Sequence, residues 1–145
     1  CMINKIMVPV DGSQIALRAL TFAIDIAKKF NSEIIVLNID IPYDLSRIKP
    51  PRKDKDGHVI VDEFKEPTPL ESAQTEAAKE KYEKISFRRL VDIDPAERIC
   101  AEAEREDVDL IVMGNRGMGV LAGFFLGSVS TKVSQSAQCP VTIVK

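Results

Sequence analysis

The chain has no tryptophan, a single histidine and only three cysteines among its 145 residues. An odd cysteine count argues against a disulfide framework, and no two of Cys1, Cys100 and Cys139 have the spacing of a metal site. We expect Cys100 to be a buried structural thiol on a helix. The only histidine, His58, falls in a charged stretch that we expect to be exposed, facing solvent without partners, so a Ser/His/Asp catalytic set is not expected.

Long apolar runs are also missing. No stretch reaches membrane-spanning length, and the beginning of the chain lacks the basic-then-apolar pattern of a signal peptide. The formal net charge is −2, from 20 basic and 22 acidic side chains, so neither nucleic acid nor a membrane is expected as a partner. Length and composition predict one cytoplasmic domain over residues 1–145.

Carboxylates are absent after Asp109, and residues 110–145 carry only Arg116, Lys132 and Lys145 as charged side chains. In the same segment glycine is concentrated: five of the seven glycines fall between residues 114 and 127. The apolar run at 110–113 is typical of a buried parallel strand, and a helix is expected to begin at Ser128. A strand, a glycine-rich loop and a helix N-terminus together present backbone N–H groups to an anion, so this segment is predicted to hold phosphate.

The spacing of these glycines resembles a known signature. Gly114-Asn-Arg-Gly117, nine further residues and then Gly127-Ser128 match the nucleotide-binding pattern of the universal stress protein family without a gap. The resemblance covers residues 1–41 and 68–145. It implies an ATP-binding regulatory protein in which Mg²⁺ is bound through the nucleotide phosphates, with no protein metal ligand and no catalytic residue.

The resemblance also implies the site. Pro9 and Asp11 would line the adenine and ribose end, Ile39 would close on adenine, and the glycine loop with the next helix would hold the phosphates. The predicted binding residues are Pro9, Val10, Asp11, Ile39, Met113, Gly114, Arg116, Gly117, Gly119, Gly127, Ser128, Val129 and Ser130. Asp11 has a second interpretation, in which it only shapes the turn and caps the following helix.

Other interpretations of the glycines fit less well. Gly117-Met-Gly119-Val-Leu-Ala122 matches a dinucleotide-binding pattern, but no acidic residue follows and too little chain remains for a second βαβ unit. Gly119 and Gly123 have the spacing of a membrane-dimer motif, but Arg116 and the nearby hydroxyls deny it an apolar span. A surface loop without a ligand remains an alternative.

Helical and strand periodicities alternate along the chain. Strands are expected at 3–10, 33–39, 86–91, 110–113 and 141–144, and helices from Ser13 to Asn31, from Thr68 to about Lys84, from Asp94, and from Ser128. This alternation predicts an α/β fold, an open five-stranded parallel sheet with helices on both faces. The strand order 3-2-1-4-5, a Rossmann-like arrangement related to the adenine nucleotide alpha hydrolases, is implied by the resemblance. In that order a ligand crevice lies between strands 1 and 4.

Residues 42–67 form an insert that departs from this alternation. They contain four prolines and many charges, which is typical of an exposed loop. Asp56-Gly57 could close a small hairpin. Asp54-Lys-Asp56-Gly57 also hints at a calcium loop, although the later ligands are missing.

The rival functions are a slow ATP hydrolase and a nucleotide-free interaction module. No Gly-Lys-Ser/Thr motif occurs, and the turn after the first strand, Val10-Asp11-Gly12-Ser13, lacks the Ser-Gly-Gly-x-Asp-Ser loop of the pyrophosphatase-type synthetases. The last strand, 141–144, would be a sheet edge with strong β-propensity and no charge or proline inside it. We therefore expect a homodimer through this strand, as the resemblance also implies; the downstream partner cannot be read from the sequence.

Overall fold

The computed structural model describes residues 2–42, 53–59, 67–116 and 126–145. The elements are β1 (Lys5–Pro9), α1 (Gln14–Phe30), β2 (Glu33–Asp40), α2 (Pro69–Glu80), β3 (Ile85–Val91), α3 (Pro95–Arg105), β4 (Leu110–Gly114), α4 (Ser128–Ser136) and β5 (Val141–Val144). All pairs in the sheet are parallel and the order is β3-β2-β1-β4-β5. The predicted fold class and strand order are confirmed.

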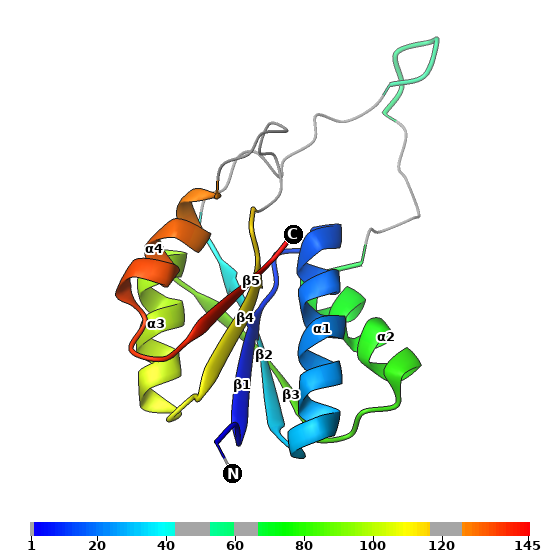
Figure 1. The fold of residues 1–145 in the computed structure, drawn as a ribbon. Coiled ribbons are helices and arrows are strands. Elements are labelled where there is room, and N and C mark those ends of the chain that lie inside the picture. Colours follow the sequence, from blue (N-terminus) through cyan, green and yellow to red (C-terminus); the bar gives the residue numbers. More distant parts are fainter. Residues whose placement is uncertain (1, 43–52, 60–66, 117–125) are drawn as a thin grey trace.

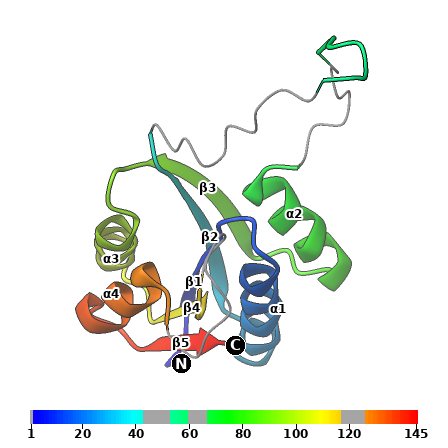
Figure 2. The same ribbon diagram turned by 90° about the horizontal axis from the view of Figure 1, so that it is seen from above.

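Two helices cover each face of the sheet, α1 and α2 on one side and α3 and α4 on the other (Figures 1 and 2). Apolar side chains alternate between these faces along the central strands: Ile6, Val8, Ile34 and Val36 pack beneath α1 and α2, whereas Met7, Ile35 and Leu37 pack beneath α3. All of these strand side chains are buried. This two-sided burial explains why the central strands are almost continuously apolar in sequence.

The helices begin where the sequence predicts. Ser13 caps α1 by accepting from the Ala16 N–H at 3.2 Å, Thr68 and Glu71 form a capping box on α2, and Asp94 caps α3 by accepting from the Glu97 N–H at 3.1 Å. Asn31 ends α1 in the left-handed conformation, with φ of 55°.

Three expectations need correction. The second helix ends at Glu80 and not near Lys84, because Lys81 adopts a left-handed φ of 53° and its N–H closes the last turn on Ala78. His58 is exposed but not without a partner, since its Nδ1 lies 3.4 Å from a carboxylate oxygen of Asp54. Cys100 is half-buried, and burial raises the pKa of its thiol. Within the described residues, no helix is long and apolar enough to cross a membrane.

Candidate functional site

The central strands β1 and β4 stop pairing before their carboxyl ends. They pair only at Ile6–Leu110 and Met7–Ile111, although β1 stays paired with β2 as far as Pro9 and β4 with β5 as far as Gly114. The Val10 N–H donates to the Leu37 carbonyl on β2. Because successive residues of a strand direct their backbone groups to opposite sides, those of Pro9 point towards β4. Proline has no N–H to donate there, which accounts for the end of the pairing. The crevice between diverging strands is where open α/β sheets bind ligands.

The loop after β1 is held by its own side chains. Oδ1 of Asp11 accepts from the Ser13 N–H at 2.9 Å and from the Ser13 hydroxyl at 2.6 Å, and Gly12 between them has φ of 89°. Asp11 therefore shapes this turn and orients the residue that caps α1. These bonds agree with a role for Asp11 in the turn, the cap of α1 is Ser13 and not Asp11, and the contact of Asp11 with a ligand stays a prediction.

The end of β4 is packed too tightly for a side chain at Gly114. A Cβ on this glycine would lie 2.9 Å from Cγ2 of Ile15, in the first turn of α1. The buried hydroxyl of Ser130 donates to the Gly114 carbonyl at 2.8 Å. The start of α1, the end of β4 and the start of α4 therefore meet at one point, which brings together segments separated by about a hundred residues of sequence.

Asn115 ties this point to the last strand and to α4. Its N–H donates to the Val144 carbonyl at 2.9 Å, and its own carbonyl accepts from the Gly127 N–H at 2.7 Å. A Cβ on Gly127 would lie 3.1 Å from Cα of Arg116, so a larger residue would force these two backbones apart. The side-chain Oδ1 of Asn115 is buried and accepts no hydrogen bond within the described residues. Sequence reasoning did not single out Asn115, because only the glycines on either side of it belong to the recognised spacing.

Helix α4 differs from the other helices at its N-terminus. Its N-cap is Gly127, which has no side chain to accept from the first amides. Within the described residues, the N–H groups of Ser128, Val129 and Ser130 have no hydrogen-bond acceptor, since the first closing bond is from Thr131 to the Gly127 carbonyl. Three free amides and the positive end of the helix dipole favour an anion at this position.

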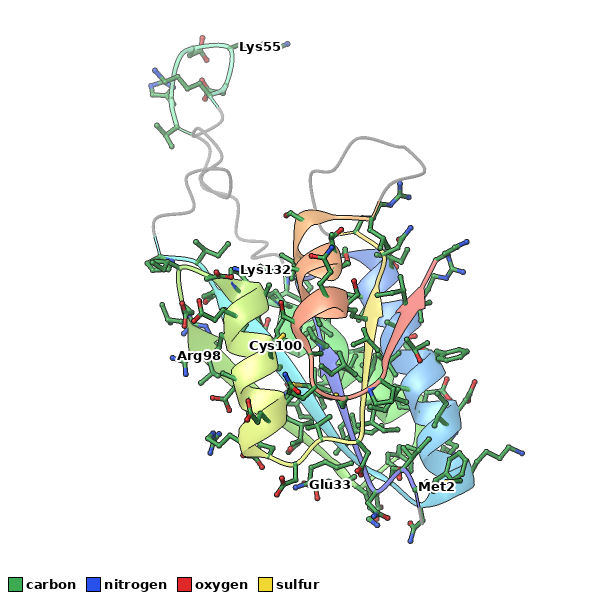
Figure 3. All side chains as sticks on the ribbon, turned by 60° about the vertical axis from the view of Figure 1, so that its left-hand side comes forward. Met2, Glu33, Lys55, Arg98, Cys100 and Lys132 are labelled. Atoms are coloured by element: carbon green, nitrogen blue, oxygen red, sulfur yellow. The ribbon has the colours of Figure 1, made fainter. Side chains whose placement is uncertain are left out.

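The charged side chains of the segment that carries α4, residues 110–145, have the sign that an anion requires. Arg116 follows β4, and no carboxylate occurs in residues 110–145. Lys132 is one turn into α4, but it forms an ion pair with Asp94 of α3. That hydrogen bond lowers the pKa of Asp94 and raises the pKa of Lys132, so both groups stay charged at neutral pH. Figure 3 labels Arg98 and Cys100 of α3 and Lys132 of α4.

The comparison with family models decides the family. The model of the universal stress protein family matches residues 2–145 of this chain. The chain belongs to the universal stress protein family. It is 32% identical over 142 residues to universal stress protein MJ0531 of Methanocaldococcus jannaschii, an alignment that covers 98% of this chain and 82% of the relative.

Solved universal stress proteins share the fold, and two of them were solved with a nucleotide. One was solved in complex with cAMP; it is 27% identical, has a TM-score of 0.72, and the match covers 100% of this chain and 99% of that one. A universal stress protein from Archaeoglobus fulgidus was solved in complex with dAMP; it is 25% identical, has a TM-score of 0.64, and the match covers all of both chains. Nucleotide binding is thus a property of some structural relatives of this protein.

In this universal stress protein, the structure places the predicted residues as follows. Pro9, Val10 and Asp11 lie at the end of β1, Ile39 in β2, Met113 and Gly114 at the end of β4, and Arg116, Gly127, Ser128, Val129 and Ser130 at the β4 and α4 side of the crevice. Gly117 and Gly119 lie outside the described residues. Two open hollows on the described surface lie elsewhere, one along the outer sides of α1 and α2 and one beside Cys139.

The apolar residues predicted for the nucleoside side of the crevice belong to the core. Val10, Ile39 and Met113 are buried. The buried amide of Asn38 donates to the Val10 carbonyl at 2.9 Å and so holds the end of β1 against β2. Asn38 is a second residue that sequence reasoning missed. Its signal was a polar side chain inside an otherwise apolar strand, which calls for a buried hydrogen-bond partner.

Proposed function

We propose that this universal stress protein binds ATP in the crevice between β1 and β4 and acts as a nucleotide-dependent regulatory protein. The observation that carries the proposal is the glycine-capped N-terminus of α4, whose first three amides have no acceptor within the described residues. The cAMP and dAMP complexes of two relatives support a nucleotide as the ligand. The glycine spacing supports a ligand with several phosphates.

The residues fit this role in two ways. The close approach of Gly127 to the backbone of Arg116 leaves no room for a Cβ, which is what a loop that folds its backbone around a phosphate requires. The hydroxyl of Ser130 is already used by Gly114, so we assign to Ser130 a backbone contact, and to the exposed hydroxyl of Ser128 a side-chain contact. Mg²⁺, when bound, would neutralise phosphate charge; it would be held by the phosphates, since the segment from 110 to 145 has no carboxylate.

The same geometry argues for slow hydrolysis at most. Fast phosphoryl transfer requires a base or a water-positioning group at the γ-phosphate. The segment that would hold the phosphates has no carboxylate or histidine, and Oδ1 of Asp11 is occupied by Ser13. We expect steady-state turnover far below the enzyme median of about 10 per second. Turnover near that value would make the protein an ATPase.

Calorimetric titration tests the binding proposal. We expect Mg·ATP to bind more tightly than AMP or cAMP, because only the triphosphate reaches all of the α4 amides. Gly117→Val should abolish ATP binding while leaving unfolding by urea unchanged. As a control, Ser136→Val places a valine at the exposed end of α4 and should bind like wild type. Equal affinity of wild type and Gly117→Val would refute the site, and absence of nucleotide binding altogether would favour the interaction module.

We also propose a homodimer through β5. The N–H groups of Ile111 and Asn115 donate to the carbonyls of Pro140 and Val144, so the alternation turns the backbone of Val141 and Ile143 outwards from the sheet. Pairing with the same strand of a second copy would satisfy those groups by a twofold contact. Ile143→Pro removes an outward N–H, and Ile143→Ala loses the same packing but keeps that N–H. Light scattering should show a shift to monomer for the proline variant only; a monomeric wild type would end the idea.

A further inference from the structure

Three metal-ligating side chains converge in the turn at residues 54–58. Asp54, Asp56 and His58 each offer one ligand atom, and these atoms all lie within 4.8 Å of one another. Their side chains are exposed, at the end of the segment that Figure 3 marks with Lys55, and none of them belongs to the crevice between β1 and β4.

The backbone of this turn is closed on itself. The Asp54 N–H donates to the His58 carbonyl at 2.9 Å, the Gly57 N–H donates to the Asp54 carbonyl at 3.1 Å, and Lys53 pairs with Val59 as an antiparallel bridge. Gly57 has φ of 85°, which glycine adopts at no steric cost. Positions 54, 56 and 58 therefore face one another before any ligand arrives, and this preorganisation lowers the ordering cost of binding.

The charges in the turn suit a cation. Oδ1 of Asp54 accepts from the N–H groups of Asp56 and His58, both at 2.9 Å, and its Oδ2 lies 3.4 Å from Nδ1 of His58. The neighbouring cations, Lys53 and Lys55, are exposed and have no ion pair within the described residues.

The bonds of Asp54 explain its own place in the turn. Within the described residues, the side chain of Asp56 makes no hydrogen bond that supports the turn, and that of His58 makes only its contact with Asp54. Two carboxylates and one imidazole directed at a common point are, by contrast, a recurrent ligand set for divalent metals.

We propose that Asp54, Asp56 and His58 bind a divalent transition-metal ion, with Zn²⁺ as the reference ion, and that water completes its coordination. An imidazole ligand favours zinc, nickel or copper over calcium and magnesium, which prefer oxygen ligands alone. An EF-hand calcium loop is excluded by the sequence: counted from Asp54, its glycine position is Val59 and its final glutamate position is Lys65. This inference does not depend on nucleotide binding.

Nuclear magnetic resonance of the His58 ring provides the test, because His58 is the only histidine and its ring signals need no assignment. Titration of the whole protein with Zn²⁺ at neutral pH should give a saturable shift of those signals, reversed by EDTA. Zinc held by the thiols of Cys100 or Cys139 would not be recorded by this ring.

Asp56→Asn is the decisive variant, because it removes one ligand charge and leaves the backbone bonds of the turn to Asp54. We expect it to weaken Zn²⁺ binding at least about tenfold, equivalent to about 1.4 kcal/mol. Asp25→Asn makes the same charge change on an exposed position of α1 and should bind like wild type. No saturable shift up to millimolar Zn²⁺ would overturn the proposal. Equal affinity of wild type and Asp56→Asn would also overturn it, since the imidazole would then bind alone.

Discussion

The two ends of the β1–β4 pair differ in how the strands are held together. At the amino end, side chains tie the strands together: Oδ2 of Asp109 accepts from the N–H groups of Asn4 and Lys5 at 2.9 and 3.0 Å, and the Lys5 ammonium donates to the Glu106 carbonyl at 3.0 Å. Arg88 of β3 forms an ion pair with Glu106 at the end of α3. At the carboxyl end, β1 and β4 separate and α4 begins without a side-chain cap.

This difference places residues that stabilise the fold at the amino end and the predicted binding groups at the carboxyl end. Backbone groups satisfied by side chains, such as those around Asp109, contribute to the free energy of unfolding whether or not a ligand is present. The first amides of α4 have no acceptor within the described residues, so under the proposal they gain one when an anion binds. Substitutions at the two ends should therefore affect different measurements.

The largest expected effect is on binding. Gly127→Val would place a branched side chain where even a Cβ lies 3.1 Å from Cα of Arg116, which displaces the start of α4. We expect ATP affinity to fall by about a hundredfold, roughly 2.7 kcal/mol, when measured by calorimetry. Gly57→Val, in the distant insert, is a control for the general cost of replacing glycine. If Gly127→Val kept the wild-type affinity, the carboxyl end of the sheet would not be the binding end.

At the amino end, Asp109→Ala should act on stability alone. It removes the acceptor of two backbone N–H groups, those of Asn4 and Lys5, which are partly exposed to water. We expect a loss of about 1–2 kcal/mol in the free energy of unfolding, measured by urea denaturation, because water replaces part of what is lost. Nucleotide affinity should stay the same. A matched decrease in affinity would show that the two ends are coupled.

Ser130→Ala tests a residue whose hydroxyl stabilises the fold and whose amide is predicted to bind the ligand. Its buried hydroxyl donates to the Gly114 carbonyl, which would be left without that partner. We expect about 1 kcal/mol lower stability by urea denaturation and only a few-fold weaker ATP binding, since the Ser130 amide remains. Ser134→Ala, at an exposed position of α4, is the matched control. A loss of affinity as large as that of Gly127→Val would assign the hydroxyl to the ligand.

The smallest effect concerns acid pH. The hydrogen bond from Arg88 is the largest cause of the lowered pKa of Glu106, with further contributions from the charges of Arg105 and Lys5. A depressed folded-state pKa contributes stability above the unfolded value of about 4.3, and that contribution is lost as the pH falls through the folded pKa.

Arg88→Met should therefore be less stable than wild type at neutral pH, and the difference should shrink as the pH falls below about 4.3. Urea denaturation between neutral and acid pH measures this, with Arg18→Met as a control at an exposed arginine for which no ion pair is seen within the described residues. A difference that does not change with pH would mean that Arg88 acts through packing and not through the charge of Glu106.

Much of the fold could be predicted because its determinants are local. The apolar runs of the central strands and the caps Ser13, Thr68 and Asp94 are readable within a few residues, and each element begins close to where the pattern puts it. The end of α2 could not be predicted, since residues 81–84 remain compatible with a helix. Its position depends on the left-handed Lys81 and on the contact between Tyr82 and the carbonyl of Ser32, fifty residues away.

The candidate site was predictable only in part, and for the same reason. The spacing of Gly114, Gly117 and Gly127 identified the loop, because backbone closeness demands glycine at fixed intervals. Nothing local indicated that Asn115 would link β5 to α4, or that the Ser130 hydroxyl would be used by Gly114. Those contacts depend on how the elements pack.

Three features follow from residues that are close together in the sequence: the alternation of strands and helices, the glycine spacing typical of the family, and the absence of carboxylates from residues 110–145. Only the tertiary structure decided that β1 and β4 separate after Met7 and Ile111, that Ile15 closes on Gly114, and that Lys132 is paired with Asp94. Such contacts join residues tens to a hundred positions apart, and no local pattern records which of the possible partners the packed sheet will bring within reach.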